Sequence, residues 1–313
     1  MRVHEQQCAA VHRVRRRDRD PVRAARLLLT LATLFWAGNW IVGRALVDVF
    51  PPAALTFWRW VLALALISPV VVPRLIAQRE ILKRHWKPIV ALGVLGGGPH
   101  NILQYWGLHY TGAANGAILT SLTPVYVMLA GALFLKEPLP RAAAIGAGIS
   151  ILGVLAIVFR LDAQALLAFR LNPGDALIIV SHLMLAAYTL GLRRRPAGLD
   201  PLSFLACFAL VALPPVGLAY LFELSTGARI VWTHGAAAGL VFVAIFPALL
   251  AYHFWALGVA ALGPARSSVF FYLTPLFGAL LAVALLGERL GLHHGVGAAL
   301  IFAGVALATR KSA

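Results

Sequence analysis

The sequence predicts an all-α integral membrane protein of ten transmembrane helices, arranged as two inverted five-helix repeats. Three observations support this fold class. The first is composition, since 61% of the 313 residues are hydrophobic, only 12% are charged and the mean hydropathy is +0.84. The second is a series of long apolar runs, and the third is a repeat of motifs between the two halves. Soluble domains are about half apolar and a quarter charged, so the surplus apolar side chains must face lipid.

The apolar runs account for ten membrane crossings. A transmembrane helix needs about 20 mainly apolar residues to cross roughly 30 Å of hydrocarbon. Pro and Gly interrupt several runs, which membrane helices tolerate when neighbours satisfy the freed backbone groups. The predicted spans are 27–47, 53–73, 88–109, 114–135, 142–159, 174–192, 201–222, 235–257, 266–286 and 294–309.

The positive charges predict the orientation. With ten spans and the N-terminus inside, 21 of the 27 Lys and Arg residues fall on the cytoplasmic side and four on the outer side. This bias predicts a multi-pass protein of the cell membrane with both termini in the cytoplasm. The net charge of +16 does not predict a nucleic-acid partner, because the cations lie in the N-terminal arm and in short links without interleaved aromatic residues. We expect residues 1–26 to form a disordered basic arm near anionic lipid.

Motifs of the first half recur in the second half at an offset of 151 residues. Between 122 and 154, 11 of 33 positions are identical to their counterparts, and the matches include a Pro, a Glu and two Gly. Five spans per half reverse the polarity of the second half, so residues 27–160 and 174–310 form an inverted repeat. Inverted repeats are characteristic of transporters with a substrate site near the midplane. The matched positions are Leu122-Thr123-Pro124 with Leu273-Thr274-Pro275, Glu137 with Glu288, Gly146 with Gly297, and Gly153 with Gly304.

Several short motifs occur in a fixed order along the chain. They are Phe35-Trp36-Ala37-Gly38-Asn39, Pro52 with Phe57-Trp58-Arg59-Trp60, Leu122-Thr123-Pro124 with Lys136-Glu137, and Leu273-Thr274-Pro275 with Gly287-Glu288-Arg289. Together they resemble the drug/metabolite transporter superfamily, in its EamA-type branch, over about 27–310. The resemblance implies ten helices around a central cavity, alternating access, and often the export of amino acids or other metabolites. It implies no particular substrate.

The third span carries the densest cluster of polar side chains at membrane depth. His100, Asn101, Gln104 and Tyr105 follow directly after Gly96-Gly97-Gly98-Pro99. His100 and Gln104 share one helix face, and Asn101 and Tyr105 share the adjoining one. Polar groups are costly when they face lipid, so the cluster predicts a cavity wall beside a break in the helix. Hydrogen bonding between neighbouring helices is the alternative.

Side chains of other spans complete the predicted cavity. The repeat places Tyr252 and Trp255 opposite Asn101 and Gln104, which suits an amphipathic substrate with one polar end. Aromatic stripes are also typical of packing, and hydroxyl groups often bond their own helix. The predicted cavity residues outside the third span are Trp36, Asn39, Trp40, Tyr126, His182, Tyr188, Tyr252, His253, Trp255 and Tyr272.

Five residues are predicted to be structural. Arg59 lies about 9 Å inside the second span, within reach of the headgroups; attraction of a substrate carboxylate near the outer mouth is the alternative. A carboxylate at a helix start stabilises the positive helix end, which is the role expected of the two Glu. The remaining four structural residues are Pro124, Glu137, Pro275 and Glu288.

The most probable activity on these grounds is secondary transport, with export of small metabolites such as amino acids. No acidic residue is predicted at the centre, so His100, His182 and His253 are the candidates if protons drive transport. No catalytic residue, metal or cofactor is predicted, because the sequence has no HExxH or GxSxG motif and Cys8 and Cys207 stand apart. An integral-membrane enzyme and a channel remain the alternatives. The expected partners are a small amphipathic substrate and the bilayer, with the chain a monomer or homodimer.

Overall fold

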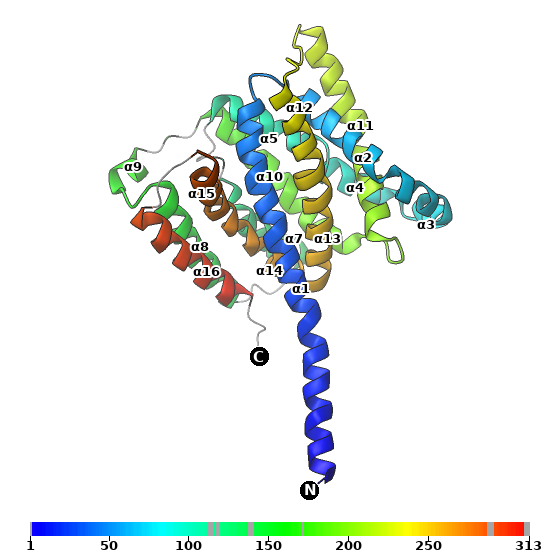
Figure 1. Cartoon of the computed structure of the whole chain (residues 1–313), viewed down its shortest axis with the longest axis vertical. Coiled ribbons are helices and arrows are strands. Elements are labelled where there is room, and N and C mark those ends of the chain that lie inside the picture. The colour runs from blue at the N-terminus through cyan, green and yellow to red at the C-terminus, as the bar shows by residue number, and fades with distance from the viewer. Residues whose placement is uncertain are drawn as a thin grey trace.

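The computed structural model describes residues 2–111, 116, 119–136, 141–168, 170, 172–286 and 291–309, with side chains for all of these except 2–20, 282, 283, 285 and 286. This part of the chain is helical and contains no strand. Six helices are long and apolar enough to cross a membrane. They are Pro21–Leu46 within α1 (Arg2–Leu46), α2 (Pro52–Ala77), α8 (Arg141–Val158), α10 continuing into η1 (Pro173–Gly191 and Leu192–Arg194), α11 (Pro201–Ser225), and His234–Leu262 (Figure 1).

The other predicted spans appear as shorter or interrupted helices. The all-α class is confirmed, whereas the count of ten crossings stays a prediction. The arm predicted for residues 1–26 also stays a prediction. The shorter helices are α3 (Arg79–Arg84), α4 (Trp86–Gly96), α5 (Pro99–Tyr110), α7 (Thr123–Leu135), α9 (Ala163–Leu167), α14 (Pro264–Ser268), η3 (Val269–Tyr272), α15 (Leu273–Leu286) and α16 (Leu292–Ala308).

Two irregular helices lie where Pro and Gly predict them. The third span is broken at Gly97 and Gly98, because Pro99 cannot donate the hydrogen bond that would continue α4 into α5. In the eighth span, α12 (His234–Val243) and α13 (Ala251–Leu262) are joined by the π-helical turn η2 (Ala244–Leu250), which contains Pro247. Interruptions of this kind leave backbone carbonyls free for side chains to bind.

The helices α8 and α16, which the sequence repeat pairs, contact each other and run in opposite directions. Gly146 lies against Gly304, and Gly153 lies against Gly297, so α8 and α16 run antiparallel although they occupy equivalent places in the repeat. Both close approaches require glycine, because an added Cβ at Gly146 would lie 2.5 Å from the Gly304 carbonyl oxygen. In Figure 1 this helix pair lies at one side of the bundle, next to α15, and both helices contribute to the main core. The first helix of each half packs against the other half. α1 contacts α13 and α15 of the second half, and α10 contacts α5 and α7 of the first half.

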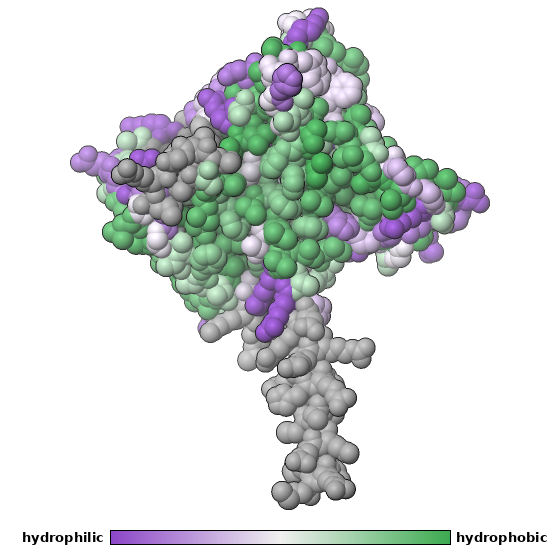
Figure 2. Space-filling model, in the orientation of Figure 1, coloured by the Kyte–Doolittle hydropathy of each residue, from purple (hydrophilic) through white to green (hydrophobic). Residues whose placement is uncertain are grey.

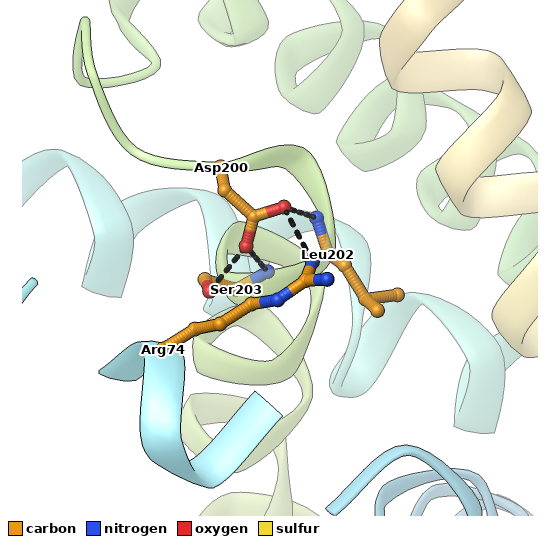
Figure 3. A network of polar contacts seen from close by, with 4 residues as sticks. All are labelled: Arg74, Asp200, Leu202 and Ser203. Carbon is orange, nitrogen blue, oxygen red and sulfur yellow. Dashed lines mark hydrogen bonds and ion pairs between the residues drawn. The ribbon is translucent and has the colours of Figure 1, made fainter. Parts of the chain in front are cut away.

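The antiparallel pair α2 and α11 is held at both ends by polar contacts. At one end, Arg74 donates a hydrogen bond of 3.3 Å to Asp200, and the Asp200 carboxylate also accepts from Ser203 and Leu202 at the start of α11 (Figure 3). Partial burial opposes ionisation of this carboxyl, but these hydrogen bonds and the Arg74 guanidinium outweigh it and lower the pKa of Asp200 below its usual value.

At the opposite end, the Glu223 carboxylate accepts hydrogen bonds of 2.9 and 3.0 Å from the backbone N–H groups of Ala53 and Ala54. These amides belong to the first turn of α2, whose N–H groups have no partner within the helix. Glu223 of α11 therefore satisfies the start of α2, whereas the start of α11 is capped by its own Asp200, which Arg74 of α2 contacts.

Replacing Asp200 by Asn is expected to lower the free energy of unfolding by about 0.5 kcal/mol, because Asn still caps a helix but cannot pair with exposed Arg74. Since the pKa of Asp200 is lowered in the fold, its contribution is present above the ordinary value of 3.8 and is lost as the pH falls through the folded-state pKa. Thermal unfolding of the purified protein from pH 7 to pH 3 measures this. Asp162→Asn is the matched control, because Asp162 caps α9 and forms no ion pair with the described residues. Equal effects of the two changes would contradict a role for Arg74.

The surface agrees with a membrane location. Figure 2 shows a broad hydrophobic area across the middle of the molecule, with hydrophilic residues concentrated towards its edges. Large apolar side chains are exposed on this surface, among them Leu133, Leu218 and Phe222. Such an area is far larger than the apolar patches of soluble proteins, so the chain is a multi-pass membrane protein.

Candidate functional site

Helices of both halves enclose a small polar cavity at the centre of the bundle. Its volume is about 20 Å³, enough for about one water molecule. The cavity is lined by twelve residues from α1, α2, α5, α10, α13, η3 and the turn before α7. They are Trp36, Asn39, Trp40, Arg59, His100, Asn101, Gln104, Thr120, His182, Leu185, Tyr252 and Phe271.

Arg59 is the only cationic residue in this lining, and it is 1% exposed. One guanidinium nitrogen donates to the Tyr105 hydroxyl at 2.9 Å, and that hydroxyl donates to the Asn39 side-chain oxygen at 2.7 Å. Nε of Arg59 has no hydrogen-bond partner. The prediction that Arg59 reaches the headgroups is therefore wrong, because α2 turns this side chain towards α5 and the centre.

No carboxylate of the described residues compensates the Arg59 charge. The three ion pairs found in this part of the chain all lie on exposed links or helix ends. The guanidinium lies 5.2 Å from the centre of the Trp60 ring, a cation–π contact that offsets only part of the cost of burial. A buried cation without an acidic partner is expensive, which makes the cavity a favourable place for an anion.

The helix break between α4 and α5 explains three of the surrounding polar side chains. The Gly97 carbonyl accepts from Trp60 Nε1 at 2.7 Å and from Asn101 Nδ2 at 3.2 Å, and the Gly96 carbonyl accepts from the Tyr252 hydroxyl at 2.6 Å. These donors replace the hydrogen bonds that an unbroken helix would make. Asn101 and Tyr252, which the repeat pairs, also lie 3.4 Å apart at the junction of the halves.

Two histidines hold α5, α10 and the turn before α7 together. His100 Nδ1 lies 2.8 Å from the Ser181 carbonyl oxygen and 2.7 Å from the Ser181 hydroxyl. The His182 ring nitrogens lie 3.0 Å from the Thr120 hydroxyl and 3.1 Å from the Thr123 hydroxyl. Both imidazoles therefore have polar partners and line the cavity at the same time.

Gln104 differs from these residues, because no hydrogen bond joins its amide to the described residues, and the residue is only 7% exposed. It lines the same cavity as Arg59. Buried amides without partners are rare in proteins. Gln104 and Arg59 thus present free donors and an acceptor to whatever occupies the cavity.

Aromatic rings form another part of the cavity wall. Trp36 stacks on Phe271 with ring centres 5.3 Å apart, and it contacts Tyr252 and Trp255 at 5.6 and 5.2 Å. Its indole nitrogen donates to the Pro247 carbonyl in the π-helical turn at 3.2 Å. The cavity thus has one polar side around Arg59 and one aromatic side around Trp36.

Several predicted cavity residues lie elsewhere. Tyr126 faces a separate groove between α4, α7 and α10. Tyr105 and Trp255 are buried behind the lining, and their polar atoms bind Asn39 and Thr189. Tyr188, His253 and Tyr272 also lie outside the lining; Tyr188 and Tyr272 are buried, and His253 is partly buried.

The structural residues fall into two groups. Pro124 lies in the first turn of α7 and Pro275 in α15, where a missing N–H is tolerated near a helix start. Glu137 and Glu288 lie outside the described residues. Four residues of the lining, Arg59, Thr120, Leu185 and Phe271, were not among the predicted cavity residues. Thr120 could have been recognised in the sequence as a hydroxyl-bearing residue at membrane depth. Nothing in the sequence distinguishes Leu185 or Phe271 from other apolar residues.

Helices packed as inverted halves around an enclosed polar centre define a membrane transport protein. The EamA-like transporter family matches residues 23–159 and 172–310, and the chain belongs to this family. Membership places it among transporters and not among enzymes, and it confirms the resemblance seen in the motifs.

Relatives of similar length support this assignment. The chain is 28% identical over 289 residues to an uncharacterized transporter of Archaeoglobus fulgidus, covering 91% of this chain and 97% of the relative. It is 27% identical over 296 residues to a probable terminal-alkyne amino-acid exporter of Streptantibioticus cattleyicolor, covering 91% and 93%. A crystal structure with 21% identity superposes with a TM-score of 0.72, covering 91% of this chain and 96% of that one, which shows a shared fold.

Proposed function

We propose that the chain is a secondary transporter that exports small metabolites, such as amino acids or similar amphipathic molecules, by alternating access through the central cavity. The observation that carries this proposal is a buried guanidinium that has no acidic partner among the described residues and lines a small closed cavity together with aromatic rings. A carboxylate would satisfy Arg59 and Gln104, and the apolar part of the same molecule would lie against Trp36.

The enclosed cavity favours a carrier over a channel. A channel needs a continuous polar path, whereas this cavity holds about one water molecule and its walls are buried. A carrier instead passes through closed states between its two open ones. A relative named as a probable amino-acid exporter supports the same class of cargo and direction.

We also propose ten crossings with both termini on the cytoplasmic side of the cell membrane. The start of the first span and the end of the last lie on one face, because Arg26 donates to the Thr309 carbonyl at 3.2 Å. An even number of crossings requires this arrangement, and the charge bias favours the cytoplasm as that side.

Untargeted analysis of metabolites released by expressing cells tests the proposal. The medium of cells that express the wild type is expected to contain at least one amphipathic compound that is absent from the medium of cells without the protein (empty cells). Gln104→Ala should lower its release about tenfold, the effect of losing one hydrogen bond to a charged group. Gln164→Ala, on the exposed helix α9, is the control at matched membrane abundance. Release equal to that of empty cells would contradict export, and equal release by both variants would contradict this cavity as the path.

A further inference from the structure

A second, larger hollow lies between α4, α7 and α10, helices labelled in Figure 1. Its volume is about 750 Å³, which is within the range of small-molecule sites. α10 forms the floor, and α4 and α7 form the walls. The groove opens towards the bilayer, since Leu183 on the floor is 47% exposed and Phe134 on one wall is 82% exposed.

The length of the groove matches one leaflet of a bilayer. One end is marked by Lys87 in the first turn of α4 and by Arg194 just after α10, and the other by Leu95 and Tyr126. Lys87 and Leu95 are eight residues apart, which corresponds to about 12 Å along a helix. Half of a hydrocarbon core is roughly 15 Å thick. The groove therefore extends from the headgroup level almost to the midplane.

Charge is confined to the headgroup end of the groove. Lys87 and Arg194 are exposed, and neither forms an ion pair with the described residues. The Lys87 ammonium lies 5.9 Å from the centre of the Trp86 ring, a contact that leaves its charge available. Apart from the Tyr126 hydroxyl, the side chains deeper in the groove are apolar.

The second half of the molecule fills the equivalent place. The repeat pairs Ala91 and Leu95 of α4 with Phe242 and Phe246, whose rings stack 5.1 Å apart. Phe242 lies over Gly38 of α1, where an added Cβ would be 2.8 Å from the ring. The fold alone therefore does not produce this groove. Small side chains leave it open in the first half, whereas phenylalanine rings fill the equivalent place in the second half.

α1 and α10 are equivalent floors for these two places. Leu29 of α1 packs against Gly258, and Ile178 of α10 packs against Gly107 in the same way. In this register Gly38 corresponds to Ala187, which lines the groove. The pair Phe242 and Gly38 in one half thus takes the place of Ala91 and Ala187 in the other.

We propose that the groove is a binding site for an anionic phospholipid, with one acyl chain between α4 and α7 and the phosphate held by Lys87 and Arg194. The leaflet-long apolar walls match an acyl chain, and the two cations match the phosphate in position and sign. A small metabolite would find no polar group along most of this length. The site is distinct from the central cavity and does not depend on the proposed function.

Native mass spectrometry of the delipidated full-length protein tests the charge at the mouth. Added phosphatidylglycerol is expected to form a one-to-one adduct at lower concentration than phosphatidylcholine. Lys87→Gln and Arg194→Gln should each weaken phosphatidylglycerol binding about fivefold, the effect of one cation near an anionic surface. Arg84→Gln, an exposed cation outside the groove, should leave binding unchanged. Equal binding of the two lipids, or an equal loss with Arg84→Gln, would overturn the proposal.

A double variant that reproduces in the groove the packing of Phe242 on Gly38 tests the apolar walls. Ala91→Phe with Ala187→Gly should remove the phosphatidylglycerol adduct, whereas Ala144→Phe on the exposed face of α8 should retain it. Unchanged thermal unfolding shows that the double variant is folded. An adduct that persists in the folded double variant would overturn the proposal. Competition between phosphatidylglycerol and the exported metabolite would also overturn it, because the groove would then be part of the substrate path. Metabolite release measured in parallel separates a failure here from a failure of the transport proposal.

Discussion

Arg59→Met is expected to lower substrate affinity about 10- to 100-fold while leaving the protein at least as stable as the wild type. The affinity should fall because hydrogen bonds to a charged group contribute about 1.5–3 kcal/mol each. Stability should not fall, since the wild-type guanidinium is buried without a carboxylate among the described residues and Met fills a similar volume. Metabolite release and thermal unfolding of the same preparations measure the two effects.

Two further variants separate the charge of Arg59 from its shape. Arg59→Lys keeps the charge but not the planar pair of donors, so intermediate release is expected. Arg44→Met is the control, because Arg44 is an exposed Arg that donates to the Leu108 carbonyl at 2.8 Å and does not line the cavity. Wild-type release from Arg59→Met would show that the guanidinium does not bind the cargo.

Gly304→Val is expected to destabilise the protein by about 2 kcal/mol or more, the usual scale of overpacking a tight contact. An added Cβ at Gly304 would lie 2.2 Å from the Ser150 hydroxyl oxygen and 2.4 Å from the Gly146 carbonyl oxygen. α8 and α16 must therefore separate to accept any side chain. Thermal unfolding in detergent, together with the yield of folded protein, measures the loss.

The same two helices supply matched controls. Gly148 of α8 and Gly295 of α16 have no atom within 4 Å of an added Cβ. Gly148→Val and Gly295→Val change helix propensity by the same small amount as Gly304→Val but add no clash. Stability of Gly304→Val equal to that of Gly295→Val would contradict close packing of the two helices.

Features that depend on local chemistry could be predicted from the sequence. The break before Pro99 follows from the missing N–H of proline. The repeat also identified the glycines that lie in the contact of α8 with α16, although it did not indicate that these two helices meet. The polar cluster of the third span also lies at the centre, because a buried polar group has few other places in a membrane protein.

Features that depend on helix rotation could not be predicted. The sequence of α2 does not indicate which of its faces meets α5, and Arg59 was predicted to reach the headgroups from its depth in the span alone. The same ambiguity explains Tyr126, which faces the groove instead of the cavity. Leu185 and Phe271 line the cavity only because neighbouring helices cross there.

Because no carboxylate of the described residues pairs with it, the Arg59 guanidinium gives the unloaded centre a net positive charge within the membrane. Moving one charge through the full membrane potential changes the free energy by about 2.3 kcal/mol per 100 mV. A bound carboxylate without an ammonium group would cancel this charge, whereas a zwitterionic amino acid would leave it unchanged. If the cargo is a simple carboxylate, only the return step of the empty protein moves a net charge, so only that step depends on voltage. If the cargo is an amino acid, both the loaded step and the return step move the charge of Arg59, so both depend on voltage. Electrical recording thus distinguishes the two kinds of cargo.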